Sequence, residues 1–267
     1  YNRNIEIAEK LINSLYTSDS KTHLIFSSST QEFLNNPYGK SKMIARKKFF
    51  EWSKKTENTF TGLIIPNLFG PFGKPNYNSV IATFCYQIIE GKTPKVIDDK
   101  KISLLYIQNL AEKVFEIIIA KKNAAQLIIK PQIEIKVSQI LEILFNFKLT
   151  YIKNGIIPDL KNVFYRDLFN TLRSYIKYPT FFPKLYKNSI DERGKFTELI
   201  KSNCQGQFSY STTNKGFVRG NHFHTRKIER FSVISGKALI KIRKIDSDEI
   251  ITFEIDGSNP SFVDIPI

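Results

Sequence analysis

Tyr38 and Lys42 are four residues apart at the start of an expected helix, and a run of hydroxyl residues, 27–30, precedes them. Residues at this spacing lie on one face of a helix, so the ammonium of Lys42 can reach the phenol of Tyr38. A phenol with a pKa of about 10 exchanges protons poorly at neutral pH until a neighbouring positive charge favours the phenolate. The pair predicts an acid–base site at which Ser29 orients the reacting carbonyl or alcohol.

The hydroxyl run follows a short apolar stretch, 23–26, which is expected to be a buried strand. Open α/β sheets bind their ligands at the carboxyl ends of such strands. A helix is expected to carry Tyr38 and Lys42 and to continue through Ala45, Phe49 and Trp52. The sequence therefore predicts that the hydroxyl run and the start of this helix lie together at one edge of a sheet.

Two of the three histidines, His222 and His224, occupy alternate positions in a region of alternating apolar and polar residues. Alternate residues of a strand point to the same face, so both imidazoles can bind one ion. Glu229 follows a short turn and can add a carboxylate, which completes two nitrogens and one oxygen around a divalent metal with an open position. Zinc is the expected metal, although iron, manganese and nickel also suit these ligands.

The spacing of these three residues, with Gly216 before them and Gly236 after them, resembles the first half of the cupin motif. Cupins are all-β jelly rolls whose interior often holds an ion or a ligand. Turn-forming residues divide the region into an expected β-meander with strands over 217–223, 230–235, 237–245, 250–255 and 261–265. The alternative is a cupin-like barrel with a vestigial metal site. The remaining strands and the fourth ligand are expected to follow residue 267.

Ser29, Tyr38 and Lys42, together with the Pro-Asn-Leu-Phe-Gly-Pro segment at 66–71, resemble the extended short-chain dehydrogenase/reductase family of nucleotide-sugar epimerases and dehydratases. The resemblance implies a Rossmann-like α/β domain. It also implies a nicotinamide cofactor, NADPH or NAD, contacted by Tyr38, Lys42 and Pro66. A UDP-sugar substrate would be bound by Asn67, Asn76 and Asn78.

One feature of that family is not found in the sequence. No glycine-rich turn of the kind that holds a dinucleotide pyrophosphate at a helix N-terminus occurs in the 267 residues. The first strands of the α/β domain are therefore expected to precede residue 1, and the 267 residues by themselves are expected to be inactive.

A proline-containing aromatic segment, 178–183, is expected to stop helix formation, which predicts a domain boundary near residue 183. The reductase domain would span 1–183 and the cupin domain 184–267. This order of domains resembles bifunctional, homodimeric enzymes of capsular polysaccharide synthesis. The resemblance implies that the cupin epimerises a UDP-4-keto-6-deoxy-N-acetylhexosamine at C-3. The reductase domain would then reduce the C-4 ketone with NADPH, on the route to UDP-N-acetyl-L-fucosamine.

Two other functions fit the sequence. The first is a redox-neutral 4-epimerase or 4,6-dehydratase with an accessory cupin, which would retain NAD tightly and consume no NADPH. The second is a non-enzymatic module for sugar binding or dimerisation on a degenerate reductase. The intact set of Ser29, Tyr38 and Lys42 argues against the second function.

Composition limits the partners. Forty basic against 25 acidic residues give a net charge of +15, but the lysines are scattered and no nucleic-acid module is recognised, so no nucleic-acid partner is expected. An anionic small molecule is compatible with this charge. Cys85 and Cys204 have no disulfide-like spacing, and no apolar run of about 18 residues occurs. We therefore expect a cytoplasmic protein with no membrane partner.

Overall fold

The computed structural model describes residues 2–17, 21–203, 206–223 and 229–265. The chain divides into two compact units, the first comprising 1–188 and 197–210 and the second comprising 189–196 and 211–267. The first unit is an α/β structure and the second contains strands, with no helix among its described residues. Among the described residues, no helix is both long enough and apolar enough to cross a membrane.

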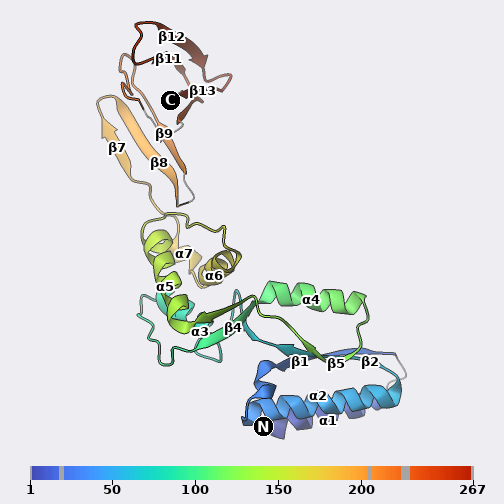
Figure 1. The fold of residues 1–267 in the computed structure, drawn as a ribbon. Coiled ribbons are helices and arrows are strands. Elements are labelled where there is room, and N and C mark those ends of the chain that lie inside the picture. Colours follow the sequence, from blue (N-terminus) through green and yellow to red (C-terminus); the bar gives the residue numbers. More distant parts are fainter. Residues whose placement is uncertain (1, 18–20, 204–205, 224–228, 266–267) are drawn as a thin grey trace. The chain divides into compact units, whose positions relative to one another are not determined.

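A parallel sheet with strand order β1-β2-β5 lies between two layers of helices in the first unit (Figure 1). Its strands are β1 (His23–Ser29), β2 (Thr59–Ile65) and β5 (Ala124–Ile128). Helices α1 (Asn2–Tyr16) and α2 (Pro37–Thr56) cover one face, and α4 (Ile107–Ile119) covers the other. This three-layer arrangement of parallel strands between helices is Rossmann-like, as the sequence predicted.

Alternation of side chains along β2 explains the three layers. Phe60 points toward α2, where it packs with Ala45 and Phe49 in a buried cluster. Leu63 points to the opposite face and packs with Leu110 and other residues of α4. Because successive strand residues face opposite sides, a central strand that is buried from Phe60 to Ile65 needs helices on both sides.

A second sheet of the first unit, with order β3-β4-β6, follows the parallel sheet in sequence. Its strands are β3 (Asn67–Phe69), β4 (Lys101–Tyr106) and β6 (Ile133–Lys136). Helices α3 (Val80–Ile89), α5 (Val137–Phe147) and α6 (Val163–Arg173) share a large apolar core with these strands. The remaining short helices are η1 (Thr30–Phe33), η2 (Lys148–Lys153) and α7 (Tyr178–Phe181).

Two local features limit elements in this part of the chain. Pro131, which cannot donate a backbone hydrogen bond, lies between β5 and β6, and these two strands belong to different sheets. Helix α6 begins at Val163 and is capped by Asn162, whose side chain accepts the Tyr165 N–H at 3.2 Å.

The strands after α7 form three further sheets. The first has the order β7-β8-β9, with β7 (Asn188–Asp191), β8 (Gly194–Ser202) and β9 (Gly206–Ser211). In the other two, β10 (Glu229–Val233) pairs with β13 (Ser261–Ile265), and β11 (Lys237–Arg243) pairs with β12 (Ile250–Asp256). The hairpin of β11 and β12 agrees with the expected meander, whereas β10 pairs with β13 in a separate sheet, so the meander is wrong in the pairing of these two strands.

The strand expected over 217–223 is also wrong, since these residues form irregular structure. Gly216, Gly220 and Asn221 have φ angles of 89°, 98° and 61°. Positive φ angles are incompatible with an extended strand, so the backbone turns repeatedly just before His222.

Candidate active site

The carboxyl ends of β1 and β2 bring the first group of predicted residues to one edge of the sheet. Ser29 is the last residue of β1, and it is paired in register with Ile65, the last residue of β2. Pro66 follows directly, and Asn67 opens β3. Ser29 therefore lies at the same edge as Pro66 and Asn67, although it is distant from them in the sequence, and open α/β sheets bind ligands at this edge.

Two neighbouring serines at this edge have different hydrogen-bond partners. Ser28 is buried, and its hydroxyl donates to the carboxylate of Glu32. Ser29 caps η1, where its Oγ accepts the Gln31 N–H at 3.2 Å. A hydroxyl that only accepts still has its own hydrogen to donate, so Ser29, rather than Ser28, is suited to bind a substrate oxygen.

Helix α2 begins where the predicted acid–base pair needs it to begin. The Asn36 side chain accepts the Gly39 N–H at 2.8 Å, and Pro37 occupies the first turn, so both residues favour a helix start. Gly39 lies against the backbone of Gln31, and a Cβ at this position would overlap the Gln31 carbonyl. This close approach places the first turn of α2 directly against η1.

Lys42 lies between the strand end and the tyrosine. Its Nζ donates to the Ser27 carbonyl oxygen at 3.1 Å and lies 6.0 Å from the centroid of the Tyr38 ring. Burial lowers the pKa of the Lys42 ammonium, and the negative charge of Glu32 partly opposes this shift. Tyr38 is 46% exposed, so its ring is open to a ligand. The arrangement provides a positive charge beside an accessible phenol.

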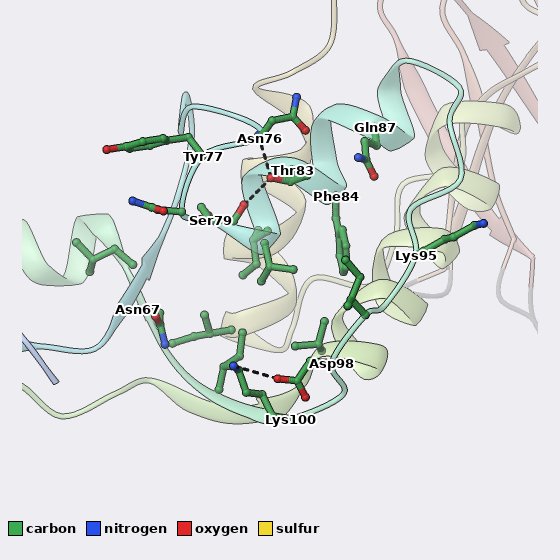
Figure 2. Close-up of a pocket in the computed structure, with 18 of the residues that line it drawn as sticks. Asn67, Asn76, Tyr77, Ser79, Thr83, Phe84, Gln87, Lys95, Asp98 and Lys100 are labelled. Carbon is green, nitrogen blue, oxygen red and sulfur yellow. Dashed lines mark hydrogen bonds and ion pairs between the residues drawn. The ribbon is translucent and has the colours of Figure 1, made fainter. Parts of the chain in front are cut away.

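A cavity of about 770 Å³ begins at Asn67 and extends past the N-terminus of α3 (Figure 2). All three asparagines predicted to bind substrate, Asn67, Asn76 and Asn78, line it. Asn76 and Asn78 have φ angles of 55° and 45°, a conformation that asparagine adopts more readily than most residues. The cavity is large enough for a small-molecule ligand.

The cavity has apolar and polar walls. The apolar wall includes Phe84, Ile102 and Leu104. At the start of α3, the Asn76 N–H donates to Thr83 Oγ1 at 3.0 Å, and on the opposite wall Lys100 forms an ion pair with Asp98 at 3.1 Å (Figure 2). A helix N-terminus and an ammonium group both attract anions, so this cavity suits a ligand with an apolar part and negative charges.

The predicted metal ligands are only partly described. His222 Nε2 lies 3.3 Å from Glu229 Oε2, so these two donors are close enough to bind one ion. His224 lies outside the described residues, and no group of three or more potential metal ligands occurs among the described ones. An imidazole and a carboxylate are suitable zinc ligands, so the described pair fits a divalent metal.

Sequence reasoning missed four residues around these sites. Glu32 and Arg46 form a buried ion pair behind Ser28, and Asp98 and Lys100 line the cavity. The position of Arg46, four residues after Lys42, shows that these two residues share a face of α2. It does not reveal that Glu32 is the ion-pair partner of Arg46. Only the packing of η1 against α2 brings Glu32 to it.

The fold and the site define a Rossmann-like domain of the epimerase/dehydratase class. The model of the NAD dependent epimerase/dehydratase family matches residues 1–127, and that of the polysaccharide biosynthesis C-terminal domain matches residues 189–267. The crystal structure of the capsular polysaccharide assembling protein CapF from Staphylococcus aureus matches with a TM-score of 0.88 and 33% identity over 97% of this chain and 71% of that chain. The chain belongs to the CapF family.

Two further relatives add detail. A UDP-2-acetamido-2,6-beta-L-arabino-hexul-4-ose reductase from Pseudomonas aeruginosa is 31% identical over 244 residues. This match covers 91% of the chain, which spans 65% of the length of that relative. The structure of RMD from Pseudomonas aeruginosa complexed with NADPH matches with a TM-score of 0.51 and 19% identity over 55% of this chain and 57% of that chain, which supports the fold alone.

Proposed function

We propose that the chain is part of a bifunctional nucleotide-sugar enzyme of capsular polysaccharide synthesis. The reductase domain, 1–183, reduces the C-4 ketone of a UDP-linked 4-keto-6-deoxy-N-acetylhexosamine with NADPH. The observation that carries this proposal is the placement of Lys42 beside Tyr38 and against Ser27, two residues before Ser29, whose hydroxyl accepts the Gln31 N–H and keeps its own hydrogen to donate. The match to the named UDP-sugar reductase supports the same substrate class.

Each residue has a defined role in this reduction. When bound, NADPH would supply a hydride to C-4 and be oxidised to NADP⁺, and the ketone oxygen would take a proton. Tyr38 donates that proton, Ser29 orients the oxygen by a hydrogen bond, and Lys42 stabilises the resulting phenolate. Pro66 adjoins this edge of the sheet and is assigned to the nicotinamide contact, together with Tyr38 and Lys42.

The cavity is proposed to hold the UDP part of the substrate, with Asn67, Asn76 and Asn78 as its polar contacts. The uracil would lie against the apolar wall, and the diphosphate near Lys100 and the N-terminus of α3. The test is calorimetric titration of the intact enzyme with UDP. Lys100→Met is expected to weaken binding about threefold to tenfold. The control is Lys101→Met, because Lys101 is the neighbouring lysine and is not among the residues that line the cavity. This variant should leave the affinity for UDP unchanged.

The C-terminal region, 184–267, is proposed to be a metal-binding cupin that epimerises the 4-keto sugar at C-3 before reduction. A base removes the C-3 proton, which the adjacent ketone makes acidic, and an acid returns a proton to the opposite face. Support comes from the division of β10 to β13 between two antiparallel sheets, which suits a jelly roll, and from the proximity of His222 to Glu229. His224 would complete a zinc site.

One experiment separates the two activities. The intact enzyme should oxidise NADPH when it is supplied with the 4-keto sugar nucleotide. In heavy water, Tyr38→Phe should still incorporate deuterium at C-3, as seen by mass spectrometry, although NADPH is no longer consumed. Tightly retained NAD with no consumption of NADPH would overturn the proposal in favour of a redox-neutral epimerase or dehydratase. We also propose that the enzyme is a cytoplasmic homodimer, which sedimentation would test.

A further inference from the structure

A buried ion pair lies behind the site. The side chains of Glu32 in η1 and Arg46 in α2 are only 2% and 9% exposed. Arg46 donates from Nε to Glu32 Oε1 and Oε2 at 3.0 and 3.1 Å, and from a terminal nitrogen to Oε2 at 2.8 Å. Such a forked contact fixes both the distance and the orientation of the two side chains.

The pair is also tied to the sheet at both ends. The Ser28 hydroxyl donates to Glu32, and the second terminal nitrogen of Arg46 donates to the Ala125 carbonyl of β5 at 2.8 Å. Gly62 of β2 makes this reach possible, since a Cβ there would lie 2.7 Å from Arg46 Cδ. Arg46 therefore crosses β2 and connects α2 to β5.

The energetics argue against a purely stabilising role. Removing two charges from water is costly, and apolar residues of similar volume often replace a buried ion pair with no loss of stability. An apolar pair, however, cannot fix the register of two segments as a forked hydrogen bond does. What the ion pair adds is the relative position of η1 and α2.

These two segments carry the acid–base residues. Ser29 precedes η1 directly, while Tyr38, Lys42 and Arg46 follow one another at intervals of four residues on one face of α2. A shift of α2 along η1 would move the phenol and the ammonium relative to Ser29. A misplacement of about 1 Å can reduce a rate by about 100-fold.

We propose that Glu32 and Arg46 are positioning residues, which hold the Tyr38–Lys42 face of α2 in register with Ser29 without touching the substrate. This inference rests on the proposed reductase function. It predicts that stability and turnover respond differently when the pair is replaced.

The test uses the double variant Glu32→Leu, Arg46→Met in the intact enzyme. Its melting temperature should stay near the parental value, and calorimetric UDP affinity should change by less than about twofold, whereas kcat for NADPH oxidation should fall about 10- to 100-fold. The matched control is Glu9→Leu, Lys48→Met, which removes the exposed 2.9 Å ion pair between α1 and α2. This control should keep its kcat. Parental kcat in the buried double variant would overturn the inference.

Two further measurements cover the other outcomes. If the double variant does not fold, Glu32→Gln, which keeps the volume of the side chain, should still lower kcat without changing UDP affinity, and Glu32→Asp should recover part of the loss. Equal losses of kcat and UDP affinity in Glu32→Gln would contradict positioning. If the parental enzyme consumes no NADPH, the proposed function fails. In that case a crystal structure of the folded double variant, or of Glu32→Gln, tests the inference independently of the reaction. The inference requires that the hydrogen bond from Lys42 to the Ser27 carbonyl be lost in that structure.

Discussion

The ammonium of Lys42 donates a hydrogen bond to the carbonyl oxygen of Ser27 at 3.1 Å, which connects α2 to the carboxyl end of β1. Ser27 lies two residues before Ser29, so this contact holds the lysine beside the strand that carries the hydroxyl. The same nitrogen lies 5.1 Å from the centroid of the Phe26 ring, a favourable cation–π distance. The side chain of Lys42 is thus held by β1 while it faces Tyr38.

Tyr38→Phe is expected to reduce NADPH-dependent ketone reduction by a factor of about 100 to 10,000, because a positioned acid is lost. Binding of UDP and of NADPH should remain nearly parental in calorimetric titration. Tyr16→Phe, which alters a half-exposed tyrosine of α1, serves as the control and should keep full activity. A rate close to the parental one in the Tyr38→Phe variant would refute the assignment of the proton donor.

Lys42→Met is expected to separate activity from stability. Burial lowers the pKa of Lys42 in the folded protein, so the unfolded chain binds this proton more tightly and the charge opposes folding at neutral pH. This unfavourable contribution is complete below the folded pKa and disappears as pH rises above the unfolded value. The variant should therefore lose turnover while its melting temperature does not fall. A large drop in melting temperature would show that the lysine is mainly structural.

The pH profile of the parental enzyme should reflect the same shift. Because the pKa of Lys42 is lowered, its ammonium is lost at a lower pH than an ordinary lysine with a pKa of about 10.4. As pH is raised, turnover should therefore begin to decline before pH reaches the ordinary lysine pKa. Steady-state kcat measured across the alkaline range checks this expectation. A rate that stays constant up to the ordinary lysine pKa would contradict it.

Elemental analysis of the intact enzyme should find a divalent metal, with zinc expected, bound in the cupin region. His222→Ala should release it, since His222 and Glu229 lie within 3.3 Å of each other. The control His23→Ala removes a histidine of β1 that bonds to Thr61, and it should retain the metal. A metal-free parental enzyme purified without chelators would eliminate the site.

Gly39→Ala should destabilise the α/β unit by about 1–3 kcal/mol or more, because its Cβ would overlap the Gln31 backbone and force η1 away from α2. Urea denaturation measures the loss of free energy of unfolding. Gly206→Ala is the matched control, since a Cβ there meets open space. Equal stability of the two variants would show that α2 and η1 are not in close contact.

The sequence by itself determined several elements of the α/β unit and predicted its chemistry. The helix through Ala45, Phe49 and Trp52 and the strand that begins at His23 follow from local hydrophobic patterns, which depend on neighbouring residues only. Tyr38 and Lys42 share a face because four residues make about one helical turn. These features are local, so the amino-acid sequence of each short segment is enough to predict them.

Only the tertiary structure decided which distant segments meet. Glu32 reaches Arg46, and Arg46 reaches Ala125, through packing that no spacing along the chain encodes. The pairing of β10 with β13 likewise depends on long-range contacts, and local alternation alone suggested a meander. Positive φ angles at Gly220 and Asn221 ended the strand expected before His222. Non-local pairing depends on the free energy of the whole fold, and local sequence patterns do not contain that information.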